Sequence, residues 1–118
     1  MLKMNDDLEG ALKEFLALLD KEQYFEAHEV LEEAWHPLRL SGHPLRNLVK
    51  GLINAAIAFE HIKRDRDDVS SKANKVMASY ERYKGLCAED IFYAALFQEA
   101  KEKVERLKQK YQDVFTTF

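Results

Sequence analysis

The segment 46–64 is the feature of this sequence that most restricts the fold. Its apolar residues fall at almost every angle around a helix of 3.6 residues per turn, instead of forming one stripe. A helix that is apolar nearly all round is stable only when other helices surround it. Gly51, Ala55 and Ala58 also provide small side chains that let a neighbouring helix approach closely. The sequence therefore predicts a central helix in an all-α protein.

Helical periodicity predicts the elements that surround this helix. Apolar residues recur at spacings of three and four in segments at about 6–20, 24–36, 69–84 and 88–115. Pro37 disfavours helical geometry at the residue before it, so the second helix is predicted to end or kink at His36. Gly85 is predicted to end the fourth helix in the left-handed conformation. We expect an all-α fold, a compact bundle of about five helices, as one domain over residues 1–118.

The last segment is long for a protein of this size. As one helix, residues 88–115 would span roughly 40 Å. We therefore expect a short first piece, followed by a longer helix that overhangs the bundle or pairs with another subunit. The apolar side chains that such an overhang would present belong to Tyr111, Val114, Phe115 and Phe118. A homodimer is the predicted partner arrangement.

Composition excludes several classes of protein. The net charge of -3 gives no basic surface for nucleic acid. The longest apolar run, Gly51–Phe59, is shorter than the roughly 20 residues that span a membrane. Cys87 is the only cysteine, and the first residues lack the apolar core of a signal peptide. We expect a cytoplasmic protein that binds neither nucleic acid nor membrane.

The segment from Tyr24 to Trp35 places a histidine and a carboxylate on one face of the second helix. At about 100° per residue, His28, Glu32 and Trp35 fall together, with Leu31 beside them. We expect them inside an apolar stripe, where a polar group without a partner is costly. Imidazole and carboxylate together suit a divalent metal ion such as Zn, Fe or Mn. His28 and Glu32 are therefore the predicted metal ligands.

The helix over 46–64 supplies a third candidate. Lys50, Asn54 and His61 form one polar line along it, because His61 lies seven residues beyond Asn54 and Asn54 four beyond Lys50. Two ligands are too few for a tight metal site. His61 is therefore the predicted third ligand or acid–base group, with Asn54 or solvent completing the shell. If this line faced water while His28 faced the core, the metal site would not form.

Two other interpretations of the His28–Glu32 pair stay open. A carboxylate beside a histidine fixes its tautomer and raises its basicity, which suits metal-free acid–base catalysis. Alternatively, the two groups form a buried hydrogen-bonded pair that only fixes helix packing. The segment also resembles the H-E-x-x-H motif of zinc metalloproteases, but Glu32 stands where the second histidine belongs, so a protease is not favoured. Glu29 is a candidate base beside the metal.

The segment 25–35 closely resembles the signature of the bacterial and archaeal domain of unknown function 309 family. That signature is H-x-x-x-E-x-x-W, matched here by His28, Glu32 and Trp35. The resemblance spans about residues 20–85. It implies a compact all-helical fold and a metal-binding role for the histidine and the glutamate, and it implies no substrate.

The central helix carries a second part of this resemblance. The stretch 51–61 is similar to the family's G-L-I-Q-x-A-x-A-x-x-H, with Asn54 where the family usually has glutamine. Asp65 and Arg66 replace the family's usual Gly-Asn, so the tight turn expected there departs from the pattern. This replacement leaves the helical core intact.

Two function hypotheses follow from these residues. The first is a metal-binding protein, extended to a metal-dependent hydrolase of a small-molecule substrate, with His28, Glu32 and His61 at its centre. The second is a non-enzymatic helical interaction module, in which the His28–Glu32 pair is structural. The sequence leaves open whether the protein is an enzyme.

Overall fold

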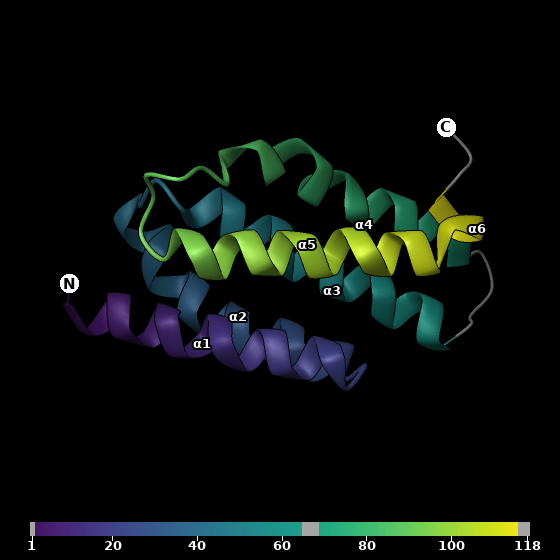
Figure 1. Cartoon of the computed structure of the whole chain (residues 1–118), viewed down its shortest axis with the longest axis horizontal. Helices are drawn as coiled ribbons and strands as arrows, with labels where there is room; N and C mark the ends of the chain where they lie inside the picture. The colour runs from purple at the N-terminus through teal and green to yellow at the C-terminus, as the bar shows by residue number, and fades with distance from the viewer. Residues whose placement is uncertain (1, 65–68, 116–118) are drawn as a thin grey trace.

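A computed structural model shows an all-α fold and describes residues 2–64 and 69–115, with side chains from Leu8 onward. Within these ranges there are five long helices and no strand, which confirms the predicted fold class (Figure 1). The long helices are α1 (Leu2–Asp20), α2 (Tyr24–Ser41), α3 (Arg46–Arg64), α4 (Val69–Tyr83) and α5 (Ala94–Lys110). The short ones are the 3-10 turn η1 (Lys84–Leu86) and α6 (Gln112–Phe115).

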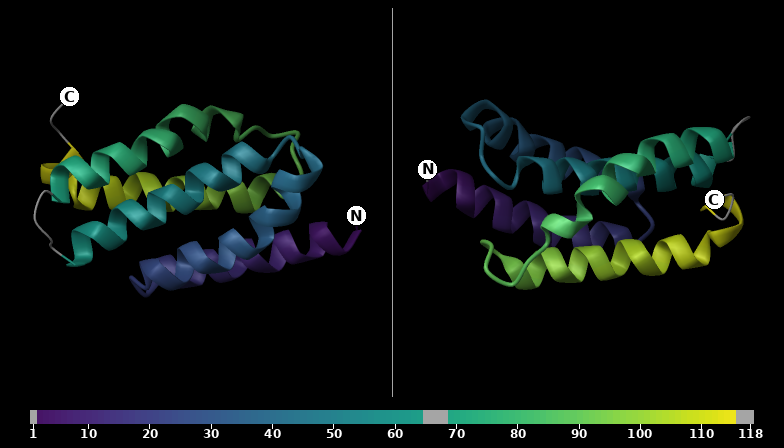
Figure 2. Two further views of the ribbon diagram at one scale, coloured as in Figure 1. Left: turned by 180° about the vertical axis from the view of Figure 1, so that it is seen from behind. Right: turned by 90° about the horizontal axis from the view of Figure 1, so that it is seen from above.

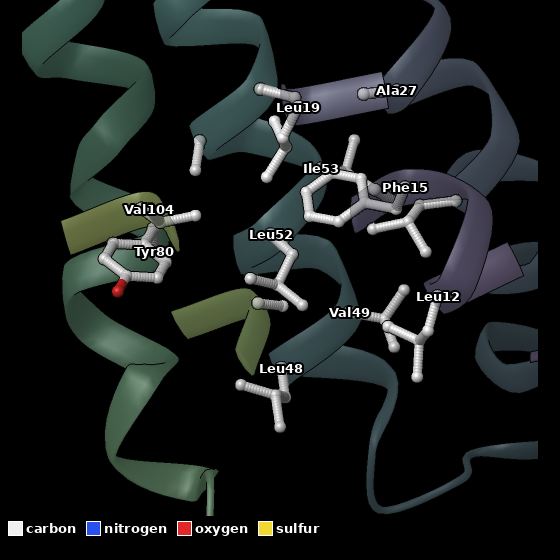
Figure 3. Close-up of a cluster of buried hydrophobic side chains, with 14 of the residues drawn as sticks. Leu12, Phe15, Leu19, Ala27, Leu48, Val49, Leu52, Ile53, Tyr80 and Val104 are labelled. Atoms are coloured by element: carbon white, nitrogen blue, oxygen red, sulfur yellow. The ribbon is translucent and has the colours of Figure 1, made fainter. Parts of the chain in front are cut away.

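Helix α3 lies at the centre, as its all-round apolar sequence predicts. It packs against α2, α4 and α5, and α1 packs against both α2 and α5 (Figures 1 and 2). Leu52 and Ile53 of α3 lie between Tyr80 on one side and Phe15 on the other, all nearly fully buried (Figure 3). None of the helices in the described ranges is both long enough and apolar enough to cross a membrane.

Helices α3 and α4 approach each other closely at Gly51. A Cβ atom built on Gly51 would lie 3.2 Å from the Cα of Tyr80 and 3.5 Å from the carbonyl oxygen of Ser79. Because those are backbone atoms of a packed helix, they cannot rotate away as a side chain would. The small residue predicted to allow close packing therefore lies where the backbones of α3 and α4 meet, and a larger residue there would push the two helices apart.

Helix α2 does not end at His36, so of the two predicted alternatives, an end or a kink, the end is wrong. The helix continues through Pro37 to Ser41. Proline has no backbone N–H, so the carbonyl group four residues earlier loses its helical hydrogen bond. Because Pro37 is exposed, water can donate to that carbonyl instead. The helix ends instead at Gly42, whose φ of 66° is left-handed, with the amides of Gly42 and His43 donating to the carbonyls of Arg39 and Leu38.

Gly85 does not adopt the predicted left-handed conformation. In the described ranges, Gly42 is the one glycine with positive φ. Helix α4 tightens into η1 over Lys84–Leu86 instead, and the Cys87 amide closes that turn on the Lys84 carbonyl at 3.1 Å. A 3-10 turn satisfies the last carbonyls without a left-handed residue.

The C-terminal segment packs on its own chain and does not overhang. Its long helix begins only at Ala94, after residues 88–93 without helix. Tyr111, Val114 and Phe115 are half-buried against the core, and the hydroxyl groups of Tyr111 and Tyr24 lie 3.2 Å apart. The expected apolar overhang is therefore wrong for these three residues, and Phe118 lies outside the described ranges. The homodimer stays a prediction without this support.

A cluster of charged side chains joins α4 and η1 to α5. The Tyr80 hydroxyl donates to Glu105 Oε2 at 2.7 Å, and Lys84 Nζ lies 2.7 Å from Glu81 and 3.3 Å from Glu105. Lys108 also bonds both glutamates. Burial alone would raise the pKa of Glu105, but the hydrogen bond from Tyr80 and the nearby lysine charges outweigh it and lower that pKa. The pKa of Glu81 is lowered by Lys108 and Lys84 in the same way.

This cluster predicts acid sensitivity. A carboxyl whose pKa is lower in the folded chain contributes stability above its unfolded pKa, and that contribution is lost as pH falls through the folded pKa. We expect the unfolding free energy to fall less between pH 5 and pH 2 in Glu105→Gln than in wild type. The difference is about 1 kcal/mol or less, because the Glu105 side chain is 39% exposed. Glu99→Gln, an exposed change on the same helix, is the control, and urea unfolding at each pH gives the comparison. Parallel curves for Glu105→Gln and wild type would contradict the assignment.

Candidate functional site

The signature residues of α2 lie at the edge of its buried face. The buried side chains of α2 are those of Tyr24, Ala27, Leu31, Ala34 and Leu38. His28, Glu32 and Trp35 each follow a member of this stripe by one residue, and all three are half-buried. No polar or charged residue is fully buried in the part of the chain that the structure describes. The prediction that these side chains lie inside the apolar stripe is therefore wrong. They lie at its edge, about 100° around the helix from the buried residues.

The polar line of α3 faces this edge of α2. Lys50 Nζ lies 4.4 Å from the centre of the Trp35 ring, which places the start of α3 beside the end of α2. At the opposite end of the pair, His61 and His28 line one pocket. Glu32 lies between His28 and Trp35 on α2, as Asn54 lies between His61 and Lys50 on α3. The two polar lines that the sequence predicted separately are both half-buried and meet at these two places, and we call this side of the two helices the α2–α3 face. Figure 2 shows the two helices side by side.

The pocket at one end of the α2–α3 face is small and open to solvent. Its volume is about 220 Å³, and its walls come from Phe25, His28, Ile57, Glu60, His61 and Arg64. That volume suits a metal ion with its waters or a few-atom organic molecule, and is below the range of drug-sized sites. The pocket therefore brings together the two histidines that the sequence named from different helices.

The ring of His28 has a defined orientation. Its Nδ1 lies 2.7 Å from the carbonyl oxygen of Phe25, and the ring packs edge-on against the Phe25 ring with centroids 5.0 Å apart. A carbonyl oxygen only accepts hydrogen bonds, so Nδ1 carries the proton. In the neutral imidazole, Nε2 is then the nitrogen with a free lone pair. A backbone partner of this kind is the usual support of a histidine that binds a metal or accepts a proton.

An ion pair that the sequence reading missed forms another wall of the pocket. Arg64 Nε lies 2.5 Å from Glu60 Oε2, and the Arg64 guanidinium stands 5.7 Å from the centre of the Phe25 ring. Because each charge compensates the other, this pair adds no net charge to the pocket. The sequence could have predicted this ion pair, because Glu60 and Arg64 are four residues apart on one helix.

The donor groups do not form a complete metal site. No group of three or more His, Cys, Asp and Glu side chains is placed to hold a metal ion in residues 8–64 and 69–115. Glu32 and Glu29 are not among the residues that line the pocket, and Glu29 is exposed. The geometry thus supplies two imidazoles, fewer than the three or four protein ligands of zinc sites. The arrangement does not fit a closed structural metal site.

Comparison with known proteins identifies a family and nothing more specific. The family described as domain of unknown function, DUF309, matches residues 12–72, just over half of the chain. This region contains His28, Glu32, Trp35 and His61. No curated protein and no solved structure matches the chain.

Proposed function

The chain belongs to the domain of unknown function 309 family, and from this premise we propose that it binds a divalent transition-metal ion at the α2–α3 face. The observation that carries the proposal is that His28 and His61 line one solvent-open pocket from two different helices. Water or a bound substrate would complete the coordination. With two protein ligands, we expect an affinity well below that of structural zinc sites.

The orientation of His28 supports this chemistry. Because Phe25 holds its Nδ1, the free Nε2 is the nitrogen that would bind the ion. Imidazole nitrogen suits zinc, iron, copper and nickel, and a carboxylate extends the range to manganese. Glu32 follows His28 by one turn, and we propose it as a third ligand that would have to turn toward the pocket.

Hydrolysis by a metal-bound water is a further proposal. An open coordination position is the requirement for such chemistry, and two protein ligands leave several. In this case His28 and Glu32 would be the two protein ligands and His61 would be the base, because Glu29 is exposed and does not line the pocket. A small-molecule substrate would have to enter beside the Glu60–Arg64 pair.

Zinc binding to single-site variants tests the proposal. Equilibrium dialysis of the purified chain should saturate near one zinc ion per chain. We expect the affinity to fall at least ten-fold in His28→Ala and in His61→Ala, since each removes one of two imidazole ligands. His36→Ala is the matched control, because His36 is exposed on the same helix and does not line the pocket. Glu32→Gln should also weaken zinc binding, because Glu32 is the proposed third ligand.

The opposite result favours the second hypothesis, in which these side chains only fix helix packing. The contact of Trp35 with Lys50 and with Arg39, whose guanidinium lies 5.6 Å from the ring centre, is the observation that favours it. On that hypothesis zinc would not bind, or would bind equally to His36→Ala and His28→Ala. The variants would instead lose folding stability.

A further inference from the structure

A second, larger pocket lies between α4, the end of α5 and α6. It has a volume of about 580 Å³ and is lined by Asn74, Met77, Ala78, Glu81, Arg82, Lys108 and Phe115. The first five residues form one face of α4, because they recur at spacings of three and four. None of them lines the pocket of the α2–α3 face.

The pocket exists because α4 and α5 are held apart. Both helices pack on α3, but long side chains bridge the space between them: Tyr80 bonds Glu105, and Lys108 bonds Glu81. Beyond this bridge, α6 closes the space at one end (Figure 1). Asn74 fixes α6 there, since its amide nitrogen donates to the carbonyl oxygen of Val114 at 2.8 Å. The pocket is therefore bounded by fixed groups on two sides.

The walls of the pocket are apolar, and its charged groups are unbalanced. Met77 is only 2% exposed, and Phe115 is half-buried. The thioether and the ring offer an adaptable surface for an apolar group. The charge of Lys108 is balanced by Glu81 and Glu105, whereas Arg82 has no carboxylate partner in the described ranges. The charged residues that line the pocket are Glu81, Arg82 and Lys108, so the lining carries a net charge of +1. The unpaired charge is that of Arg82.

We propose that this pocket binds a small amphipathic anion, an aromatic or aliphatic carboxylate or sulfonate. The apolar body would pack on Met77, Ala78 and Phe115, and the anionic head would bond the Arg82 guanidinium, which presents several donors to a carboxylate. The volume is in the range of pockets that hold such molecules. The proposal is independent of the metal site.

Fluorescence titration with anilinonaphthalene sulfonate tests this proposal, because the probe is an apolar anion of the right class. We expect saturable binding at one site per chain and competition by decanoate. Arg82→Gln should weaken binding about five-fold, the effect of one partly exposed charge pair. Lys75→Gln is the matched control, since it removes the same charge from an exposed position of α4 outside the pocket. Its affinity should stay at the wild-type value.

Ala78→Trp provides a second, steric arm. Ala78 is exposed at the mouth of the pocket, so an indole there should fill the pocket without disturbing the core. Saturable binding should disappear while the thermal midpoint stays near that of wild type. Absence of saturable binding below millimolar probe would overturn the proposal. An equal loss in Lys75→Gln and Arg82→Gln, or no loss in Arg82→Gln, would also overturn it, whether or not Ala78→Trp folds.

Discussion

Replacement of Phe59 by alanine is expected to lower the unfolding free energy by about 3–5 kcal/mol, because it leaves a cavity in the core. Phe59 is fully buried on α3. Its ring centroid lies 5.6 Å from that of Tyr24, 6.0 Å from that of Tyr111 and 6.1 Å from that of Phe115. One side chain thus joins the central helix to α2 and to the C-terminal segment.

Urea unfolding followed by circular dichroism measures this effect. Phe92→Ala is the control, because Phe92 is 62% exposed and its removal should change stability by less than about 0.5 kcal/mol. A stability loss below about 1 kcal/mol in Phe59→Ala would show that the C-terminal segment does not pack on α3 as described.

Replacement of Gly51 by valine is expected to cost about 2–4 kcal/mol, through overpacking. The added Cβ would already lie 3.2 Å from the Cα of Tyr80, and the two methyl groups would extend further toward α4. The helices would have to separate, which would disturb the Tyr80–Glu105 hydrogen bond as well. The expected loss therefore combines steric strain with a weakened bridge to α5.

Gly10→Ala separates this steric effect from helix propensity. Gly10 lies within α1, and a Cβ there would meet nothing within 4 Å. Alanine should therefore stabilise the protein by about 0.5–1 kcal/mol, the usual propensity gain over glycine in a helix. Thermal unfolding of both variants gives the comparison. If Gly51→Val were as stable as wild type, the close contact of α3 and α4 would be wrong.

The central helix was predicted accurately because its apolar pattern does not depend on how the surrounding helices are arranged. An apolar surface on all sides requires neighbours whatever their identity, and the predicted bounds 46–64 agree with α3. The end of α2 was missed for a local reason. Proline at an exposed position costs one helical hydrogen bond, which water can replace, and the helix ends instead at Gly42, which can adopt the left-handed conformation.

The sequence named His28, Glu32 and His61 as candidate site residues, but it did not predict their environment in the fold. The residues Leu31 and Glu32 are adjacent in sequence, and 100° of rotation separates the core from its edge, which periodicity alone resolves poorly. The meeting of His28 with His61 depends on the register of α2 against α3, which is set by the turn at Gly42 and by the packing around Gly51. Neither is encoded in the spacing within one helix.

Imidazole nitrogen spectra during a zinc titration test the central claim most directly, because each of the four histidines gives its own signals. The proposed site predicts that the signals of His28 and His61 change together, at the same zinc concentration, while those of His36 and His43 do not change. The His28 change should appear at Nε2, because Nδ1 is held by the Phe25 carbonyl. Unchanged signals of His28 and His61, or equal changes in all four histidines, would contradict a metal site on the α2–α3 face.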